Sequence, residues 1–253
     1  MVAGEVLGKE VTLKARNDYA WGPAKLDHQG RARLDEIKII VTPEDSVRIG
    51  ALLSNQAGFI RQIQAYDEQR VTDRKFPVYA ASTRGVNDSL AFRPDNERVA
   101  DVRVRKALLH ATNAKEIVQT LFTANYPQAK GVIVSTAAGF VDLSAELAFD
   151  EAKAKALLDE AGWVPQADGI RAKDGLPLVL STYESLNYLQ NREVLQLVAQ
   201  QWAKVGVKLN VLSGDLGSKT IDSLDPEKTA LIPAMVGRAD PDVIKSNSVS
   251  YTH

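Results

Sequence analysis

The stretch from residue 177 to residue 211 constrains the fold most, because it reads as strand, helix and strand joined by short connections. Residues 177–183 form a β-rich run. Residues 191–205 carry apolar side chains at helical spacing on one face, and Gly206 ends that pattern. Residues 207–211 then alternate apolar and polar, as a half-buried strand does. This order predicts a βαβ unit in a partly parallel sheet, and therefore a mixed α/β chain.

Further elements are predicted on both sides of this unit. Residues 36–42 read as a strand, and a helix follows that Thr42 can cap and that continues toward Asn55. Asn113 matches a capping box, and Asp150 is a predicted N-cap. A polar stretch at 64–75 is predicted to be an irregular connection that crosses between two compact bodies. The other predicted segments are a strand at 76–81, a turn-rich stretch at 84–96, helices at 100–111, 113–122 and 150–162, and an apolar run at 230–236.

Charge and hydropathy exclude several classes of partner. The formal net charge of the 253-residue chain is -1, so it has no long-range field to hold a polyanion, and we expect no nucleic-acid partner. No apolar run approaches the roughly 20 residues that a membrane helix needs. The start lacks the basic and apolar regions of a signal peptide. The protein is therefore either cytoplasmic or exported by a signal outside this sequence.

The residues that usually carry catalysis or bind metal are sparse. The chain has no cysteine, which excludes disulfides, thiol nucleophiles and cysteine-ligated metals. Its three histidines lie far apart and show no metal-ligand spacing. There is no Gly-x-Ser-x-Gly motif, phosphate loop or dinucleotide fingerprint. We therefore do not expect an enzyme, a cofactor or a metal site.

Four short motifs follow one another along the chain. They are Lys14–Tyr19 with Trp21 and Gly22, Asp101–Leu108 with Ala111 and Asn113, Asp150 with Glu160–Trp163, and Gln200–Trp202 with Val205–Val207. In this order, they resemble the extracytoplasmic solute-binding proteins of the oligopeptide, dipeptide and nickel ABC importers (family 5). The resemblance extends from about Lys14 to Asp242. It departs at Asn55–Gly58, where the family usually has Gly, Glu or Gln, any residue, and Asp.

The resemblance implies an α/β fold of the periplasmic-binding-protein type, class II. Its mixed sheet is flanked by helices and is incomplete without the rest of lobe I. Residues 1–75 would be a remnant of lobe I with a strand and a helix, and residues 76–253 would be the α/β domain of lobe II. Family members are much longer, so we expect the middle portion of such a protein, which provides one wall of the ligand cleft.

The resemblance also implies a function. The protein would capture a small solute, a peptide or peptide-like molecule, outside the cytoplasmic membrane and deliver it to the permease of an ABC importer. It would be a monomer, either periplasmic or lipid-anchored at the cell surface, that closes around the ligand by a hinge movement. Two alternatives stay open: the ligand-sensing domain of a regulator, and an uncharacterised hydrolase.

The segment Arg238–Asp242 is the main predicted ligand site, because the resemblance implies that an aspartate after the run 230–236 pairs with a ligand ammonium. Asp240 is the first match and Asp242 the alternative. A part-buried carboxylate is costly unless a cation pairs with it. Equally, an Asp-Pro-Asp sequence can be only a turn with a helix cap. Arg238 either binds a ligand carboxylate or pairs with Asp240 or Asp242.

A second predicted contact region lies between the strand 177–183 and the following helix. Tyr183, Glu184 and Asn187 occupy this loop, and loops after strands commonly form the ligand crevice of open α/β sheets. The alternative is an ordinary polar surface loop. Trp163, Trp202 and His110 are interpreted as packing residues. Trp21 could face the ligand or the core, and the core is the favoured interpretation.

Overall fold

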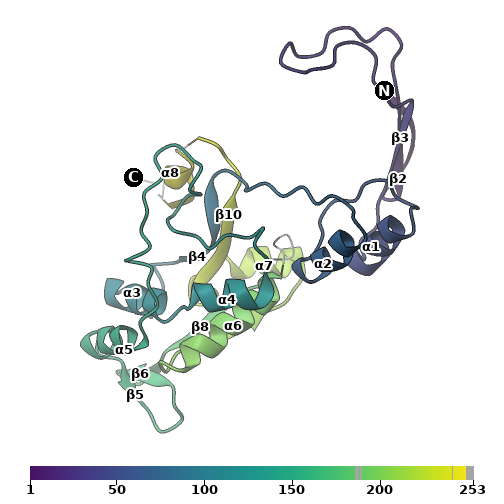
Figure 1. Cartoon of the computed structure of the whole chain (residues 1–253). Helices are drawn as coiled ribbons and strands as arrows, with labels where there is room; N and C mark the ends of the chain where they lie inside the picture. Colours follow the sequence, from purple (N-terminus) through teal and green to yellow (C-terminus); the bar gives the residue numbers. More distant parts are fainter. Residues whose placement is uncertain (186–187, 189, 241, 249–253) are drawn as a thin grey trace. The chain divides into compact units, whose positions relative to one another are not determined.

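The computed structural model describes residues 1–185, 188, 190–240 and 242–248. By its internal contacts the chain divides into two compact units, Met1–Pro77 and Val78–His253. Strands and helices occur in both (Figure 1), which confirms the predicted α/β class. The assignment of the units to lobes I and II stays a prediction.

Three antiparallel strands form the sheet of the Met1–Pro77 unit. They are β1 (Val2–Val6), β2 (Glu10–Lys14) and β3 (Glu36–Ile40), which pair in that order. β3 confirms the predicted strand. Every residue of β1 and β3 is exposed, including isoleucines at 37, 39 and 40, so this sheet buries little apolar surface within its own unit.

Two helices supply the small core of this unit. α1 (Asp45–Leu53) buries Ile49 and Leu52, and α2 (Ala65–Asp73) buries Ala65 and Val71. α2 shows that the predicted polar crossing at 64–75 was wrong, because two buried apolar residues suffice to dock a helix that is otherwise polar. The prediction of Thr42 as a cap was also wrong. α1 begins later, and the Thr42 carbonyl instead accepts a hydrogen bond of 2.7 Å from the Arg48 guanidinium.

Two two-stranded ladders form the sheet region of the Val78–His253 unit. β8 (Val179–Tyr183) and β9 (Lys208–Leu212) are parallel, and β10 (Leu231–Val236) and β4 (Val86–Phe92) are antiparallel. The ladders lie side by side because the N–H of Ala230, just before β10, donates to the Ser181 carbonyl of β8 at 3.1 Å. Together they give the mixed parallel and antiparallel arrangement that the sequence predicted.

Helix α6 (Asn191–Ala203) connects β8 to β9, which confirms the predicted βαβ unit. Its apolar face is buried through Leu195, Val198 and Trp202. The Trp202 indole N–H also donates to the Thr112 hydroxyl at 2.9 Å. The ring therefore links α6 to the connection at residues 111–113. Trp202 is thus a packing residue, as predicted.

Three further helices pack around this core (Figure 1). They are α3 (Val102–His110), α4 (Ala114–Leu121) and α5 (Glu151–Glu160). Side chains cap all three: Asp101, Asn113 and Asp150 accept backbone N–H bonds of 2.8, 3.1 and 2.9 Å. The predicted caps Asn113 and Asp150 are confirmed, but the capping box is only half formed, because the Asn113 N–H donates to the side chain of Gln201.

Arg171 joins a small three-stranded sheet to the main core. The small sheet consists of β5 (Val164–Pro165), β6 (Arg171–Lys173) and β7 (Leu176–Pro177). The guanidinium of Arg171 is buried and donates to the carbonyls of Val205 (2.8 Å) and Trp163 (2.6 Å) and to Asp159 (2.5 Å). Trp163 itself is buried, as predicted.

Two predictions about residues 76–96 were wrong. No strand forms at 76–81, where the chain has no partner in a ladder. The stretch expected to be rich in turns contains β4. The polar run Asn87, Asp88 and Ser89 conceals this strand in the sequence, whereas pairing with the apolar β10 supplies its partner in the fold.

The remaining helices are α7 (Leu216–Asp222) and α8 (Val243–Ser248). His110 is buried, and its Nδ1 lies 2.8 Å from the Ala148 carbonyl, in line with the predicted packing role. Within the described part of the chain, no helix has the length and apolar character required to span a membrane.

Candidate functional site

One end of the sheet region gathers the predicted ligand residues that the structure describes. β8 and β9 end together there because they are parallel. β10 runs in the same direction, since Met235, near its end, donates its N–H at 3.0 Å to the hydroxyl of Tyr188, which follows β8. β4 begins there, because Val86 pairs with Val236. We call this end the carboxyl edge; it comprises residues 183–185, 212–215, 236–240 and 84–86.

Such an edge is where open α/β sheets place ligands, since the loops that leave the strands surround a crevice there. Tyr183, Arg238 and Asp240 all lie at the carboxyl edge, although 55 residues separate Tyr183 from Arg238 in the sequence. Asp242 follows two residues later. Asn187 lies outside the described residues.

The Tyr183 hydroxyl is already engaged within the protein. It donates to Asp222 Oδ2 at 2.7 Å, and Lys228 Nζ donates to the other oxygen of Asp222 at 2.9 Å. The bond to the carboxylate raises the pKa of Tyr183 and lowers that of Asp222. The ring is 8% exposed and packs on Gly214, where an added Cβ would lie 3.1 Å from it. This network holds α7 against β8, and a ligand role for Tyr183 stays a prediction.

The polar loop after β8 is tied to its neighbours by its backbone. The Glu184 N–H donates to the Leu212 carbonyl at 3.0 Å, and the Glu184 carbonyl accepts a bond from Lys219. The Ser185 N–H donates to the Asn191 side chain at 2.7 Å. These bonds fix the beginning of the loop, up to Ser185.

Asp240 forms the turn that the alternative interpretation predicted. Its Oδ1 accepts a bond of 3.0 Å from the Asp242 N–H, and its carbonyl accepts one of 3.1 Å from the Val243 N–H. Val243 is buried against Val86 and Ile133, which anchors the turn to the start of β4. Asp240 and Asp242 are both exposed. The turn uses one Asp240 oxygen, while Oδ2 makes no bond to the described residues, so a ligand role for Asp240 or Asp242 stays a prediction.

Arg238 lies where two chain segments pass each other in close contact. An ideal Cβ on Gly85 would lie 1.9 Å from the Val236 carbonyl oxygen, 2.7 Å from the Arg238 nitrogen and 2.9 Å from its oxygen. Gly85 also has a φ of +132°, a conformation that side chains rarely adopt. On the opposite segment, a Cβ on Gly237 would lie 2.8 Å from Thr83 Cγ2. Only glycine fits at Gly85, a constraint that sequence reasoning missed.

Asp88 is a second residue that sequence reasoning missed, because it lies on the unpredicted strand β4. The protein atoms around its carboxyl group raise the pKa of Asp88 to about 6 through desolvation. The bond from the Ser89 backbone acts in the opposite direction and does not offset this. Asp88 makes no ion pair with any of the described residues. Among all the residues that the structure describes, no three His, Asp or Glu side chains come together as metal ligands would.

The aromatic residues of the Met1–Pro77 unit form a separate surface feature. Trp21 is 60% exposed, so its predicted core position was wrong within this chain. Its ring lies 4.7 Å from that of Tyr19 and 4.9 Å from the Arg16 guanidinium carbon, an arrangement typical of a cation–π contact. The three residues line a shallow recess of about 280 Å³. Contacts of this kind hold the indole ring in place at the surface without covering it.

Comparison with known proteins identifies a family. Residues 1–245 match the family described as bacterial extracellular solute-binding proteins, family 5 Middle. The dipeptide-binding protein of Escherichia coli K12 is 25% identical over 234 residues, which cover 92% of this chain and 41% of that protein. Heme-binding protein A of Haemophilus influenzae is 26% identical over 217 residues, which cover 85% of this chain and 38% of that protein.

Solved structures show the same fold. NikA from Brucella suis, in complex with Fe(III)-EDTA, superposes with a TM-score of 0.78 at 23% identity, over 96% of this chain and 48% of NikA. AppA from Bacillus subtilis, in complex with a nonapeptide, superposes with a TM-score of 0.67 at 20% identity, over 96% of this chain and 47% of AppA. The chain therefore spans less than half the length of these relatives.

Proposed function

Because the chain belongs to the bacterial extracellular solute-binding proteins of family 5, we propose that it captures a small solute, a peptide or peptide-like molecule, outside the cytoplasmic membrane. The solute would then pass to the membrane permease of an ABC importer. The family match confirms the resemblance predicted from the four motifs. It covers all but the last eight residues and is the observation that carries this proposal.

The names of the relatives support a solute of this class. They include proteins that bind dipeptides, glutathione and oligopeptides, all of which carry peptide bonds, amino groups and carboxylates. The carboxyl edge offers an exposed carboxylate at Asp240 and an exposed guanidinium at Arg238. These groups complement the two charges at the ends of a peptide.

The mechanism we propose is binding without chemistry. The relatives are named as solute-binding proteins, and we infer that this chain likewise has no catalytic activity. Two lobes would close over the solute, because the solute binds the closed form more tightly than the open one. The importer, and not this protein, would use ATP. We propose that the protein acts as a monomer, in the periplasm or lipid-anchored at the cell surface, and that it binds no nucleic acid.

A thermal-shift screen tests this function. The chain is heated with di- to pentapeptides, glutathione or chelated nickel, each at about 100 times the expected Kd, where specific binding stabilises by about 2.7 kcal/mol. Asp240→Ala should lose the shift if this residue pairs with the ligand ammonium. Asp168→Ala is the matched control, since Asp168 accepts the same kind of turn bond, 2.9 Å from the Ile170 N–H, away from the carboxyl edge.

The outcomes separate the function from the role of Asp240. A shift that persists in Asp168→Ala but disappears in Asp240→Ala supports both. A shift that persists in both variants supports the function and refutes the ligand role of Asp240. If no member of the three solute classes shifts the midpoint, the peptide preference is refuted.

A further inference from the structure

Helix α7 (Figure 1) contacts the protein through its charged side chains. Its Asp222 binds the Tyr183 hydroxyl and Lys228. Its Lys219 donates to the Glu184 carbonyl. These bonds hold one face of α7 against the end of β8. An ordinary surface helix turns its apolar face toward the protein and its charged face toward water, so the polarity of α7 is inverted.

The apolar side chains of α7 and of the turn that follows it are exposed. Leu216 is 81% exposed, Leu224 is 77% exposed, and Ile221 between them is also exposed. No residue of α7 is buried. Leu216 and Leu224 lie eight positions apart, a spacing that keeps two residues on the same side of a helix and about 12 Å from each other. Two leucines of nearly equal exposure thus occupy the two ends of this helix face.

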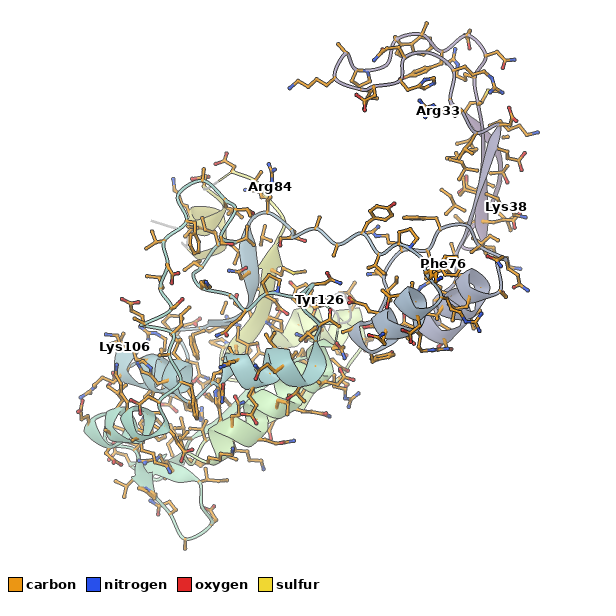
Figure 2. All side chains as sticks on the ribbon, in the orientation of Figure 1. Arg33, Lys38, Phe76, Arg84, Lys106 and Tyr126 are labelled. Atoms are coloured by element: carbon orange, nitrogen blue, oxygen red, sulfur yellow. The ribbon has the colours of Figure 1, made fainter. Side chains whose placement is uncertain are left out.

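Leu216 begins α7 directly after Asp215, the last residue of this segment that belongs to the carboxyl edge. Figure 2 marks the same edge by Arg84, which is another of its residues. The chain is held firmly on both sides of this junction. Asp215 caps the helix by accepting two backbone N–H bonds of 2.8 and 3.0 Å, and Gly214 before it packs on the Tyr183 ring. Of the two exposed leucines, Leu216 is therefore the one at the carboxyl edge.

The charged groups beside Leu216 are engaged within the protein. Asp215, Lys219 and Asp222 are the only charged residues from 215 to 224, and each makes hydrogen bonds to other residues. A polar solute group that left water for this surface would find few partners and would lose free energy. An apolar group would gain free energy, because it and the Leu216 side chain would leave water together. The chemistry that complements α7 at the carboxyl edge is therefore apolar.

We propose that Leu216 is a specificity-determining residue that takes an apolar side chain of the solute, of the leucine or phenylalanine type. This proposal rests on the function proposed above and narrows its solute class to peptides with such a side chain. Segments that leave the carboxyl ends of the strands are the ones that contact ligands in open α/β sheets, and ligand pockets are lined mainly by apolar side chains. Leu224 is too far along α7 to contact the same solute side chain.

N-acetyl-leucinamide and N-acetyl-asparaginamide test this subsite without reference to any natural solute. Both are neutral and carry side chains of similar size, one apolar and one polar. Each is titrated into the 253-residue chain with ¹³C-labelled leucine methyl groups, and the methyl signals are followed by NMR. Leu216→Asn and Leu224→Asn assign the two leucines, and Leu224→Asn is also the matched control, because it makes the same change at nearly the same exposure. The methyl signals of the buried Leu195 show that each variant is folded.

We expect N-acetyl-leucinamide, but not N-acetyl-asparaginamide, to shift the Leu216 signals with a Kd of about 10 mM, while the Leu224 signals stay in place. Saturation transfer from the protein to N-acetyl-leucinamide should fall about ten-fold in Leu216→Asn and stay unchanged in Leu224→Asn. Unshifted Leu216 signals, equal shifts with both compounds, or equal shifts of Leu216 and Leu224 would each overturn the subsite.

The subsite and the proposed function can fail separately. A solute found in the thermal-shift screen that binds Leu216→Asn as tightly as the unchanged chain supports the function and overturns the subsite. Conversely, binding of N-acetyl-leucinamide at Leu216, without a thermal shift by any peptide, glutathione or nickel chelate, supports the subsite and refutes the peptide preference.

Discussion

Replacing Gly85 with alanine is expected to destabilise the Val78–His253 unit strongly. The added methyl group would lie 1.9 Å from the Val236 carbonyl oxygen and 2.7 Å from the Arg238 nitrogen. Both are backbone atoms, so no side-chain rotation relieves the contact. Moreover, the φ of +132° is strained for any residue with a Cβ.

The expected loss of stability follows from two costs. The backbone conformation alone costs about 1–3 kcal/mol once a Cβ is present. Moving the Val236 carbonyl by more than an ångström would also break hydrogen bonds at the end of the β4–β10 ladder, each of which contributes about 1 kcal/mol. The free energy of unfolding should therefore fall by about 4 kcal/mol, a large part of the 5–15 kcal/mol typical of a domain.

Urea unfolding followed by tryptophan fluorescence measures this loss, since Trp163 and Trp202 are both buried in the same unit. Gly139→Ala is the matched control. Gly139 also has a positive φ, of +79°, but nothing lies within 4 Å of the place its added methyl group would occupy, so only about 1–2 kcal/mol should be lost. Equal unfolding midpoints for Gly85→Ala and Gly139→Ala would refute the close approach of β4 and the segment 236–238.

Three further substitutions test other parts of the structure. Arg171→Met should cost about 3 kcal/mol in urea unfolding, because it leaves two buried carbonyl groups without donors; a loss below 1 kcal/mol would contradict this. Tyr183→Phe should cost about 1 kcal/mol and return the pKa of Asp222, measured by NMR titration, toward its ordinary value; an unchanged pKa would show that the hydroxyl bond is absent. The hydrogen bond from the Arg103 side chain is the main reason that the pKa of Asp101 is lowered to about 2. The charge of Asp101 therefore stabilises the fold above pH 3.8, and this contribution disappears as the pH falls toward 2. Asp101→Asn keeps a capping oxygen without the charge, so it should cost about 1 kcal/mol at pH 7 and nothing near pH 2. An equal loss of stability at both pH values would refute the charge effect.

The elements with a strong local pattern were predictable from the sequence. The βαβ unit at 177–211 was predicted because an amphipathic helix and an alternating strand each repeat their signal over several turns or pairs. The caps Asn113 and Asp150 were predicted because their hydrogen bonds reach only three residues along the chain. Local chemistry determines both kinds of feature, and a single sequence contains it.

Features that depend on a distant partner were not predictable in this way. β4 is polar at three of its seven positions, and its partner β10 begins 139 residues after the end of β4 in the sequence. α2 has two buried apolar residues and four acidic or basic ones in nine positions, too weak a stripe to indicate a helix. The constraint on Gly85 arises only when residues 236–238 pass beside it. In each case tertiary pairing, and not local propensity, determines the conformation.

The groups at the carboxyl edge differ in how much of their bonding capacity remains for a solute. The Tyr183 hydroxyl donates its only proton to Asp222, and the turn occupies one oxygen of Asp240. A solute ammonium could therefore use only the second oxygen of Asp240. Acetylating the N-terminus of a bound peptide should then weaken binding about as much as Asp240→Ala does, because both changes remove the same ion pair. A loss of binding with only one of the two changes would assign the peptide ammonium to another group.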